Sequence, residues 1–121
     1  DKAWHAIHFL LTRSVWEGKW PEAFLLVGGR QIGDDDVGYG PARGLTRAET
    51  AAVAEMLARI TVDELASRFD GRELDRAKIY PEIWSRDGDD ALEYLKSCYS
   101  RLREFVATAR TKKMGMLIFM V

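Results

Sequence analysis

Three side chains of this chain could do chemistry: Tyr39 and Arg43, which lie in a glycine-rich stretch, residues 28–46, and His8. Arg43 carries a guanidinium group that can hold a carboxylate or phosphate through two parallel hydrogen bonds. Tyr39 could stack on a bound ring, and His8 could act as a general acid or base. Together they predict a small-molecule-binding protein, or an enzyme, that uses a glycine-rich cleft.

The same residues also have structural interpretations. Residues 28–46 hold more than half of the ten glycines, which indicates tight turns or close backbone approach. Arg43 would then form a salt bridge to Asp34, Asp36 or Glu82 and so fix this loop. His8 falls within an apolar helical stripe, where a histidine commonly makes one ring hydrogen bond at the edge of a core.

The absence of a nucleophile, base and orienting residue favours a different class of function, a partner-binding or interaction protein, for instance a toxin-neutralising one. Aromatic and arginine side chains dominate protein interfaces, and Trp16, Trp20, Tyr39 and Trp84 are the candidates here. Packing inside the core is the alternative for Trp84. We find no set of nucleophile, base and orienting residue, so the sequence leaves open whether the protein is an enzyme.

The sequence predicts neither a metal site nor a cofactor. His5 and His8 could share a metal ion, but Cys98 is the only other imidazole or thiol, and zinc sites use three or four protein ligands. A calcium loop that starts at Asp34 would need a glutamate where Leu45 stands. Asp34–Asp36 is therefore expected to be a solvated turn, and Cys98 a buried thiol in a reducing cytoplasm.

Charge and length restrict the partners. The chain of 121 residues has a formal net charge of −1, which gives no overall attraction for nucleic acid. No apolar run reaches the roughly 20 residues of a membrane-spanning helix. We therefore expect a cytoplasmic protein that binds no membrane, and we do not expect nucleic acid as a partner.

Hydrophobic periodicity predicts several helices over residues 2–13, 47–60 and 62–69. Thr46 with Glu49, and Thr61 with Glu64, have the spacing of capping boxes at the start of the last two helices. Residues 21–29 favour a short helix, and a buried strand is the alternative.

The longest helix is predicted at about residues 88–112. Its inward stripe is expected to comprise Leu92, Leu95, Tyr99, Leu102, Phe105, Val106 and Ala109. Residues 114–121 are apolar throughout and predict a buried strand, whose best partner is the segment 39–45. The expected fold is therefore α+β, a small sheet packed against several helices.

Three stretches together resemble the YfbM-like family of bacterial proteins, a domain-of-unknown-function family. They are residues 1–12, the segment 38–46 with Gly-Tyr-Gly-Pro-Ala-Arg, and residues 79–84 with Ile-Tyr-Pro-Glu-Ile-Trp. The resemblance implies a single domain over residues 1–121 with a small sheet under several helices. It supplies no catalytic residue, cofactor or substrate.

The resemblance also implies that this chain lacks a further N-terminal strand and helix of the family. The strand at residues 114–121 would then expose an unpaired edge, and such edges recruit other chains. We therefore expect a homodimer, or aggregation, through this edge.

Overall fold

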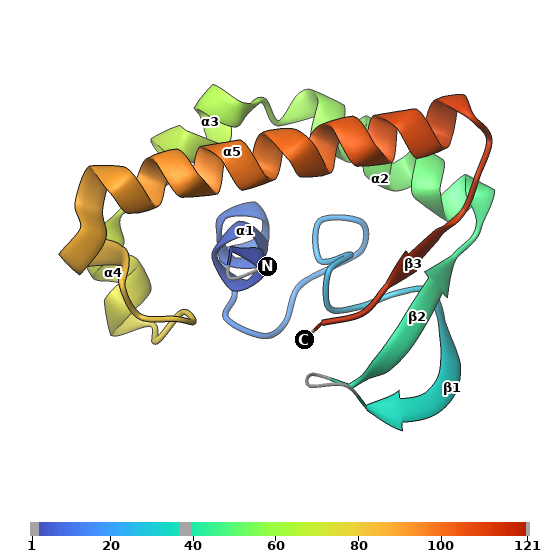
Figure 1. The fold of residues 1–121 in the computed structure, drawn as a ribbon, viewed down its shortest axis with the longest axis horizontal. Coiled ribbons are helices and arrows are strands. Elements are labelled where there is room, and N and C mark those ends of the chain that lie inside the picture. The colour runs from blue at the N-terminus through green and yellow to red at the C-terminus, as the bar shows by residue number, and fades with distance from the viewer. Residues whose placement is uncertain (1–2, 37–39, 121) are drawn as a thin grey trace.

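The structure, a computed structural model, describes residues 3–36 and 40–120. Within these residues the chain forms five helices and one three-stranded sheet, so the α+β class is confirmed. Figure 1 shows the longest helix running along the molecule, the first helix beneath it, and the sheet at one end. The elements in chain order are α1 (Trp4–Thr12), β1 (Arg30–Asp36), β2 (Pro41–Leu45), α2 (Arg47–Arg59), α3 (Val62–Ser67), α4 (Gly71–Arg76), α5 (Trp84–Thr111) and β3 (Met116–Ile118).

The sheet is antiparallel, with the strand order β1-β2-β3. The register pairs Arg43 with Ile118 and Leu45 with Met116. The predicted pairing of segments 39–45 and 114–121 is confirmed for the described residues, because β2 and β3 lie within those two segments. β3 is one edge of this sheet.

The third strand, β1, comes from the glycine-rich stretch itself. The prediction of a turn at Asp34–Asp36 was wrong, because these residues belong to β1. The register of β1 against β2 is irregular between Ile32 and Asp36, and Gly33 lies there with a φ of 71°. Aspartate and glycine have low strand propensity, so pairing with β2 rather than local preference explains this strand.

The capping box at the start of α2 is confirmed. The Thr46 hydroxyl accepts a hydrogen bond from the Glu49 N–H at 3.1 Å, and the Glu49 carboxylate accepts one from the Thr46 N–H at 2.8 Å. Thr61 caps α3 through the Glu64 N–H at 3.1 Å. These bonds satisfy donors that a helix start leaves unpaired, and they fix where both helices begin.

The longest helix begins earlier than predicted, at Trp84, and Gly88 interrupts its helical geometry with φ 48° and ψ −117°. The Asp75 carboxylate accepts hydrogen bonds from the Ser85 hydroxyl and from the N–H groups of Ser85 and Trp84. These bonds, the hydroxyl's foremost, hold the pKa of Asp75 below its usual range. Asp75 therefore caps α5 from α4, a partner that the sequence pattern does not reveal.

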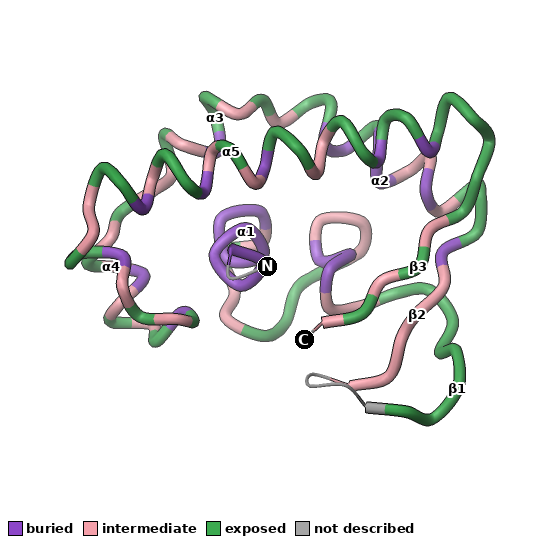
Figure 2. Tube along the Cα trace, viewed as in Figure 1, coloured by how far each residue is buried: buried purple, intermediate pink, exposed green. Residues whose placement is uncertain are grey.

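The inward stripe of α5 is confirmed at Leu95, Tyr99 and Val106, which are fully buried. Phe105 was predicted to face inward, and this was wrong, because 64% of it is exposed. Figure 2 shows buried and exposed positions alternating along α5, which packs its inner side on the domain. The helix therefore has a wider apolar surface than its core contacts use.

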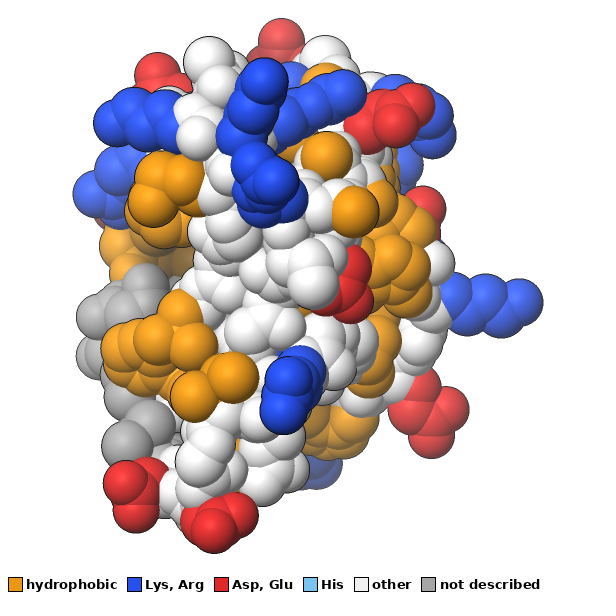
Figure 3. Space-filling model, turned by 90° about the vertical axis from the view of Figure 1, so that its right-hand side faces the viewer, with side chains coloured by type: hydrophobic (Ala, Val, Ile, Leu, Met, Phe, Trp, Pro, Cys, Tyr) orange, Lys and Arg blue, Asp and Glu red, His pale blue; other side chains and the backbone are white. Residues whose placement is uncertain are grey.

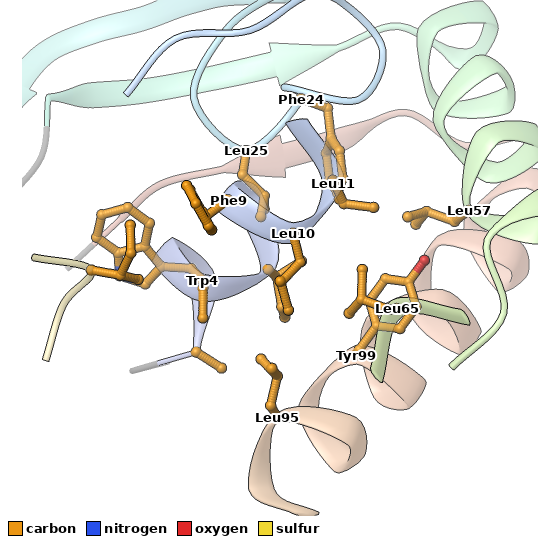
Figure 4. Packing of buried hydrophobic residues seen from close by; sticks show 14 of the residues in the cluster. Trp4, Phe9, Leu10, Leu11, Phe24, Leu25, Leu57, Leu65, Leu95 and Tyr99 are labelled. Carbon is orange, nitrogen blue, oxygen red and sulfur yellow. The ribbon is translucent and has the colours of Figure 1, made fainter. Parts of the chain in front are cut away.

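Helix α1 lies at the centre of the core. All eight residues from Trp4 to Leu11 are buried, including His5 and His8. Figure 4 shows Leu10 pointing toward Leu95 and Leu65, with Tyr99 and Leu57 beyond. A helix that is buried on every face must be covered by several elements, and α3, α5 and the segment after α1 supply that cover.

Residues 21–29 form consecutive turns, so the predicted helix there was wrong. The Ala23 N–H donates to Lys19 O at 2.9 Å and the Val27 N–H to Ala23 O at 2.8 Å. The carbonyls of Phe24 and Leu25 instead accept hydrogen bonds from the Arg43 guanidinium. Because these carbonyls point to a side chain, the regular helical pattern ends.

We predict that Leu95→Ala lowers the free energy of unfolding by about 2–5 kcal/mol, because it leaves a cavity in a closed core. Urea denaturation measures this loss. Phe105→Ala on the same helix is the control, and its effect should stay within about 0.5 kcal/mol, because the side chain is mostly exposed. Equal losses in both variants would contradict the assignment of the two faces.

Candidate functional site

The residues predicted as a small-molecule site have separate surroundings. His8 is fully buried within α1, and its Nε2 lies 3.4 Å from the Thr12 hydroxyl. Burial lowers the pKa of His8, against a backbone hydrogen bond at Glu17. Its other ring nitrogen, Nδ1, has no hydrogen-bond partner among the described residues. The side chain is thus enclosed by core atoms.

The hydrogen bonds of Arg43 among the described residues are to backbone carbonyls. Its guanidinium donates to the backbone carbonyls of Gly28 at 2.6 Å, Phe24 at 2.7 Å and Leu25 at 2.7 Å. The predicted salt bridge to Asp34 or Glu82 was wrong, because no ion pair among the described residues includes Arg43. The side chain of Asp36, the third predicted partner, lies outside the described part of the chain. Burial lowers the pKa of Arg43. Arg43 therefore fastens residues 24–28 to β2.

Trp84 is fully buried at the start of α5, and its indole N–H donates to Ile79 O at 3.0 Å. Tyr39 lies outside the described residues. No hydrogen bond or ion pair joins any two of His8, Arg43 and Trp84 in the described part of the chain. The structure therefore does not gather these candidates around a common cleft.

His5 is held as a neutral imidazole. Its Nδ1 accepts a hydrogen bond from the Tyr80 N–H at 3.0 Å, so that nitrogen carries no proton. Its Nε2 lies 2.9 Å from Val15 O, to which it donates. The ring stacks against both Trp4 and Trp16, with centroid distances of 5.1 and 4.2 Å. Burial lowers the pKa of His5, which agrees with this neutral form.

An apolar groove of about 750 Å³ lies between α5 and β3. Its floor comes from the start of α1 and from Phe24 and Leu25, the residues that Arg43 holds in place. The residues that line it are Ala3, Trp4, Ile7, Phe24, Leu25, Tyr94, Cys98, Arg101, Leu102, Phe105, Val106, Met116, Leu117, Ile118, Phe119 and Met120. We refer to this set as the apolar groove.

Large hydrophobic side chains are exposed along both walls of the apolar groove. Phe105 on α5 is 64% exposed, and Leu117 and Phe119 on the β3 side are more than half exposed. Figure 3, which views the sheet end of the molecule, shows exposed hydrophobic patches below a gathering of Lys and Arg side chains. Soluble proteins rarely expose a large continuous apolar patch, and where one occurs it commonly marks a binding site.

The sequence contained a signal for this groove. Tyr94, Cys98, Leu102 and Phe105 repeat at helical spacing, one position away from the buried stripe of α5. The expected buried thiol is half-buried instead, since Cys98 lies in this second stripe. One core needs a single stripe, so a second stripe beside it indicates a second apolar contact.

The edge of β3 that faces away from β2 pairs with no strand among the described residues. Residues 116–120 also form a wall of the apolar groove. An edge strand presents backbone N–H and C=O groups in a row, and these need partners when water is excluded. The groove is thus lined by apolar side chains and by residues of a strand that has no partner on one side among the described residues.

Arg101 is the single charged residue that lines the apolar groove. It lies on α5, is exposed, and donates to Cys98 Sγ at 3.4 Å. None of the ion pairs between described residues includes it. No helix within residues 3–36 and 40–120 has the length and apolar character of a membrane span.

A family model described as "Domain of unknown function (DUF1877)" matches residues 1–119. Comparisons with curated proteins and with solved structures found no match. The family description names no activity, substrate or partner. The function therefore has to be inferred from the groove itself.

We predict that Arg43→Lys lowers the free energy of unfolding by about 1–3 kcal/mol, because an ammonium group cannot reach three carbonyls in the planar arrangement of a guanidinium. Urea denaturation measures the loss. Arg47→Lys is the matched control, since Arg47 is exposed on α2. A variant as stable as the wild type would show that the three hydrogen bonds do not fasten the loop.

We also predict that the domain loses stability as the pH falls from about 7 to about 5. The pKa of His5 is lowered in the folded state, so the unfolded state binds more protons below its own pKa of about 6.5. Stability is therefore complete above that value and decreases below it; His8 contributes with the same sign. Urea denaturation at several pH values measures this, and a curve that is flat or rises on acidification would contradict it.

Proposed function

The chain belongs to the family described as Domain of unknown function (DUF1877), and we propose that it is an interaction domain whose apolar groove binds an extended segment of a partner protein. One observation carries the proposal: residues 116–120, which include β3, line the groove, and β3 has no strand on its far side among the described residues. A toxin-neutralising protein is one instance of such a domain. The finer YfbM-like assignment belongs to the same proposal, and the order of the three matching stretches supports it.

The backbone of β3 supports an extended occupant. A segment laid along its free edge would accept and donate main-chain hydrogen bonds and add a fourth strand to the sheet. Strand addition of this kind obtains affinity from the backbone and specificity from side-chain pockets. A small apolar molecule would leave the backbone groups of β3 unpaired.

The walls of the groove support the same occupant. Side chains alternate between the two faces of a strand, so every second residue of the added segment would point toward Leu102 and Phe105 on α5. These contacts would remove exposed apolar surface from water on both partners. The exposed side chains, which do not stabilise the core, would then contribute to binding.

The alternative function is a small-molecule-binding protein or enzyme that uses Arg43, Tyr39 and His8. Such a site needs a guanidinium that faces the ligand, whereas three of the five N–H donors of Arg43 point to backbone carbonyls. It also needs access to His8, which is fully buried. The hydrogen bonds of Arg43 and the burial of His8 therefore favour the interaction domain over a small-molecule site.

The predicted homodimer concerns the same edge. A second copy of this chain could pair its β3 with the free edge of the first, so self-association is the competing occupant. Light scattering over a dilution series distinguishes it from a foreign segment, because only self-association depends on the concentration of this protein alone.

We predict that a phage-displayed random heptapeptide library yields binders to the wild type that Phe105→Glu weakens at least about tenfold, because it places a charge at the centre of an apolar contact. Phe105 is mostly exposed, so this variant keeps its fold. Ile32→Glu is the matched control, because Ile32 is a half-exposed hydrophobic residue on β1 outside the groove.

Alkylation of Cys98 gives a second measurement of the same event. Cys98 is the single cysteine of the chain and lines the groove, so a bound peptide should slow its reaction with a maleimide. Peptides that bind Phe105→Glu and wild type equally, and leave the alkylation rate unchanged, would overturn the proposed function.

A further inference from the structure

We propose that His5 is an acid-sensitive latch: the neutral ring holds residues 80–82 against α1, and the protonated ring releases them while the rest of the domain stays folded. The latch is a conformational switch inside this chain. It does not depend on the proposed function, because no partner takes part in it.

The two ring nitrogens of His5 respond differently to a second proton. Nε2 already carries a proton and donates to Val15 O at 2.9 Å, and it keeps this hydrogen bond when the ring becomes charged. Nδ1 accepts the Tyr80 N–H at 3.0 Å, for which it needs its lone pair. A proton on Nδ1 would set two N–H donors against each other. The bond to Val15 therefore persists, and the bond to Tyr80 breaks.

The rings around His5 allow it to carry a charge within the folded domain. Its imidazole stacks against Trp4 and Trp16 at centroid distances of 5.1 and 4.2 Å. Indole faces attract a cation, so both contacts become more favourable when the ring is protonated. Burial opposes the charge and lowers the pKa of His5. The latch therefore opens in acidic solution, below the ordinary histidine pKa of about 6.5.

No carboxylate neutralises the charge on His5. None of the ion pairs between described residues includes it. His8, which lies one turn further along α1, is a second buried histidine, and the charge of His5 opposes its protonation. The segments on either side of the His5 ring carry further ionisable residues, none with a hydrogen bond to that ring: Arg13, Glu17, Lys19, Lys78, Tyr80 and Glu82. For Tyr80 this concerns the phenol group. His5 is therefore the group whose protonation state decides the contact.

The segment that His5 holds has a strained backbone. Lys78 and Glu82 have φ values of 57° and 62°, in the left-handed region that is unfavourable for residues other than glycine. The Ile79 N–H donates to a carbonyl of α4 at 3.0 Å, and the Glu82 N–H donates to Ile79 O at 2.9 Å. These two bonds do not reach α1, whereas the bond from Tyr80 to His5 does. Loss of that bond removes a restraint from a segment that stores strain.

Other contacts hold both ends of this segment, so its release stays local. Ile79 is fully buried, and its carbonyl accepts the Trp84 indole N–H at 3.0 Å. The backbone N–H of Trp84 donates to the Asp75 carboxylate at 3.1 Å. Neither bond involves His5. Residues 80–82 lie between these fixed points and are the part that moves.

The test follows amide hydrogen exchange by NMR between about pH 7.5 and 4.5, together with the ring signals of His5. Protection is the exchange rate of an amide relative to an unstructured peptide at the same pH. We expect the Tyr80 amide to lose about tenfold more protection than the Ile79 amide as His5 becomes protonated, because only the first is bonded to the ring. This comparison uses the wild type, so it does not depend on whether a variant folds.

Two variants assign the effect to one histidine. His5→Gln cannot be protonated, and its amide can still accept the Tyr80 N–H or donate to Val15 O. His8→Gln is the matched control, because His8 is also fully buried on α1. His5→Gln should keep the Tyr80 amide equally protected across the pH range, and His8→Gln should retain the loss seen in the wild type.

Three results would overturn the latch. The first is a Tyr80 amide that stays protected while the His5 ring titrates. The second is an equal loss of protection at Tyr80 and Ile79, which would mean that acid destabilises the whole domain at once. The third is a loss that persists in His5→Gln or disappears in His8→Gln. None of these results affects the proposed function, because no peptide is present.

Discussion

The enclosure of α1 is the constraint on which the rest of the structure depends. All residues of this helix from Trp4 to Leu11 are buried, so every side of it has to be covered. Helix α5 covers it with Leu95 and Tyr99, and residues 21–29 cover it from the sheet side. The polar atoms that α1 brings into the core need partners, and His5 obtains them from Val15 and Tyr80, two loops that flank the helix. Packing and hydrogen bonding therefore hold the same segments in place.

Arg43 connects this core to the apolar groove. Its three hydrogen bonds fasten residues 24–28 to β2, and the same Phe24 and Leu25 form the floor of the groove. This attachment explains why glycine is needed in residues 28–46. Gly29 has a φ of 76°, and a Cβ atom there would lie 2.7 Å from Gly44 O, so the chain needs glycine where it turns into β1. The stretch for which the sequence predicts a ligand cleft thus supplies Arg43, which fastens residues 24–28 to β2.

The sequence predicted those features that depend on residue spacing within one short segment. The capping box at Thr46, the buried face of α5 and the pairing of segments 39–45 and 114–121 follow from spacing and from an apolar run, and all three are confirmed for the described residues. The strand β1 could not be predicted, because aspartate and glycine adopt it only when β2 supplies the hydrogen bonds. The partners of Arg43 are backbone carbonyls, which leave no trace in the side-chain sequence. Phe105 was assigned to the core, since periodicity does not show where one packed surface ends and another begins.

The division of α5 into two apolar stripes connects stability with binding. Leu95, Tyr99 and Val106 are fully buried and stabilise the domain, whereas Phe105 and Leu117 leave more than half of their surface in water. Exposed apolar walls beside a free strand edge favour association, because an occupant would remove this apolar surface from water. Any segment that binds only the folded state raises the free energy of unfolding in proportion to the logarithm of its concentration relative to its dissociation constant. Because the floor of the groove is also the cover of α1, occupancy of the groove and stability of the core are coupled through Phe24 and Leu25.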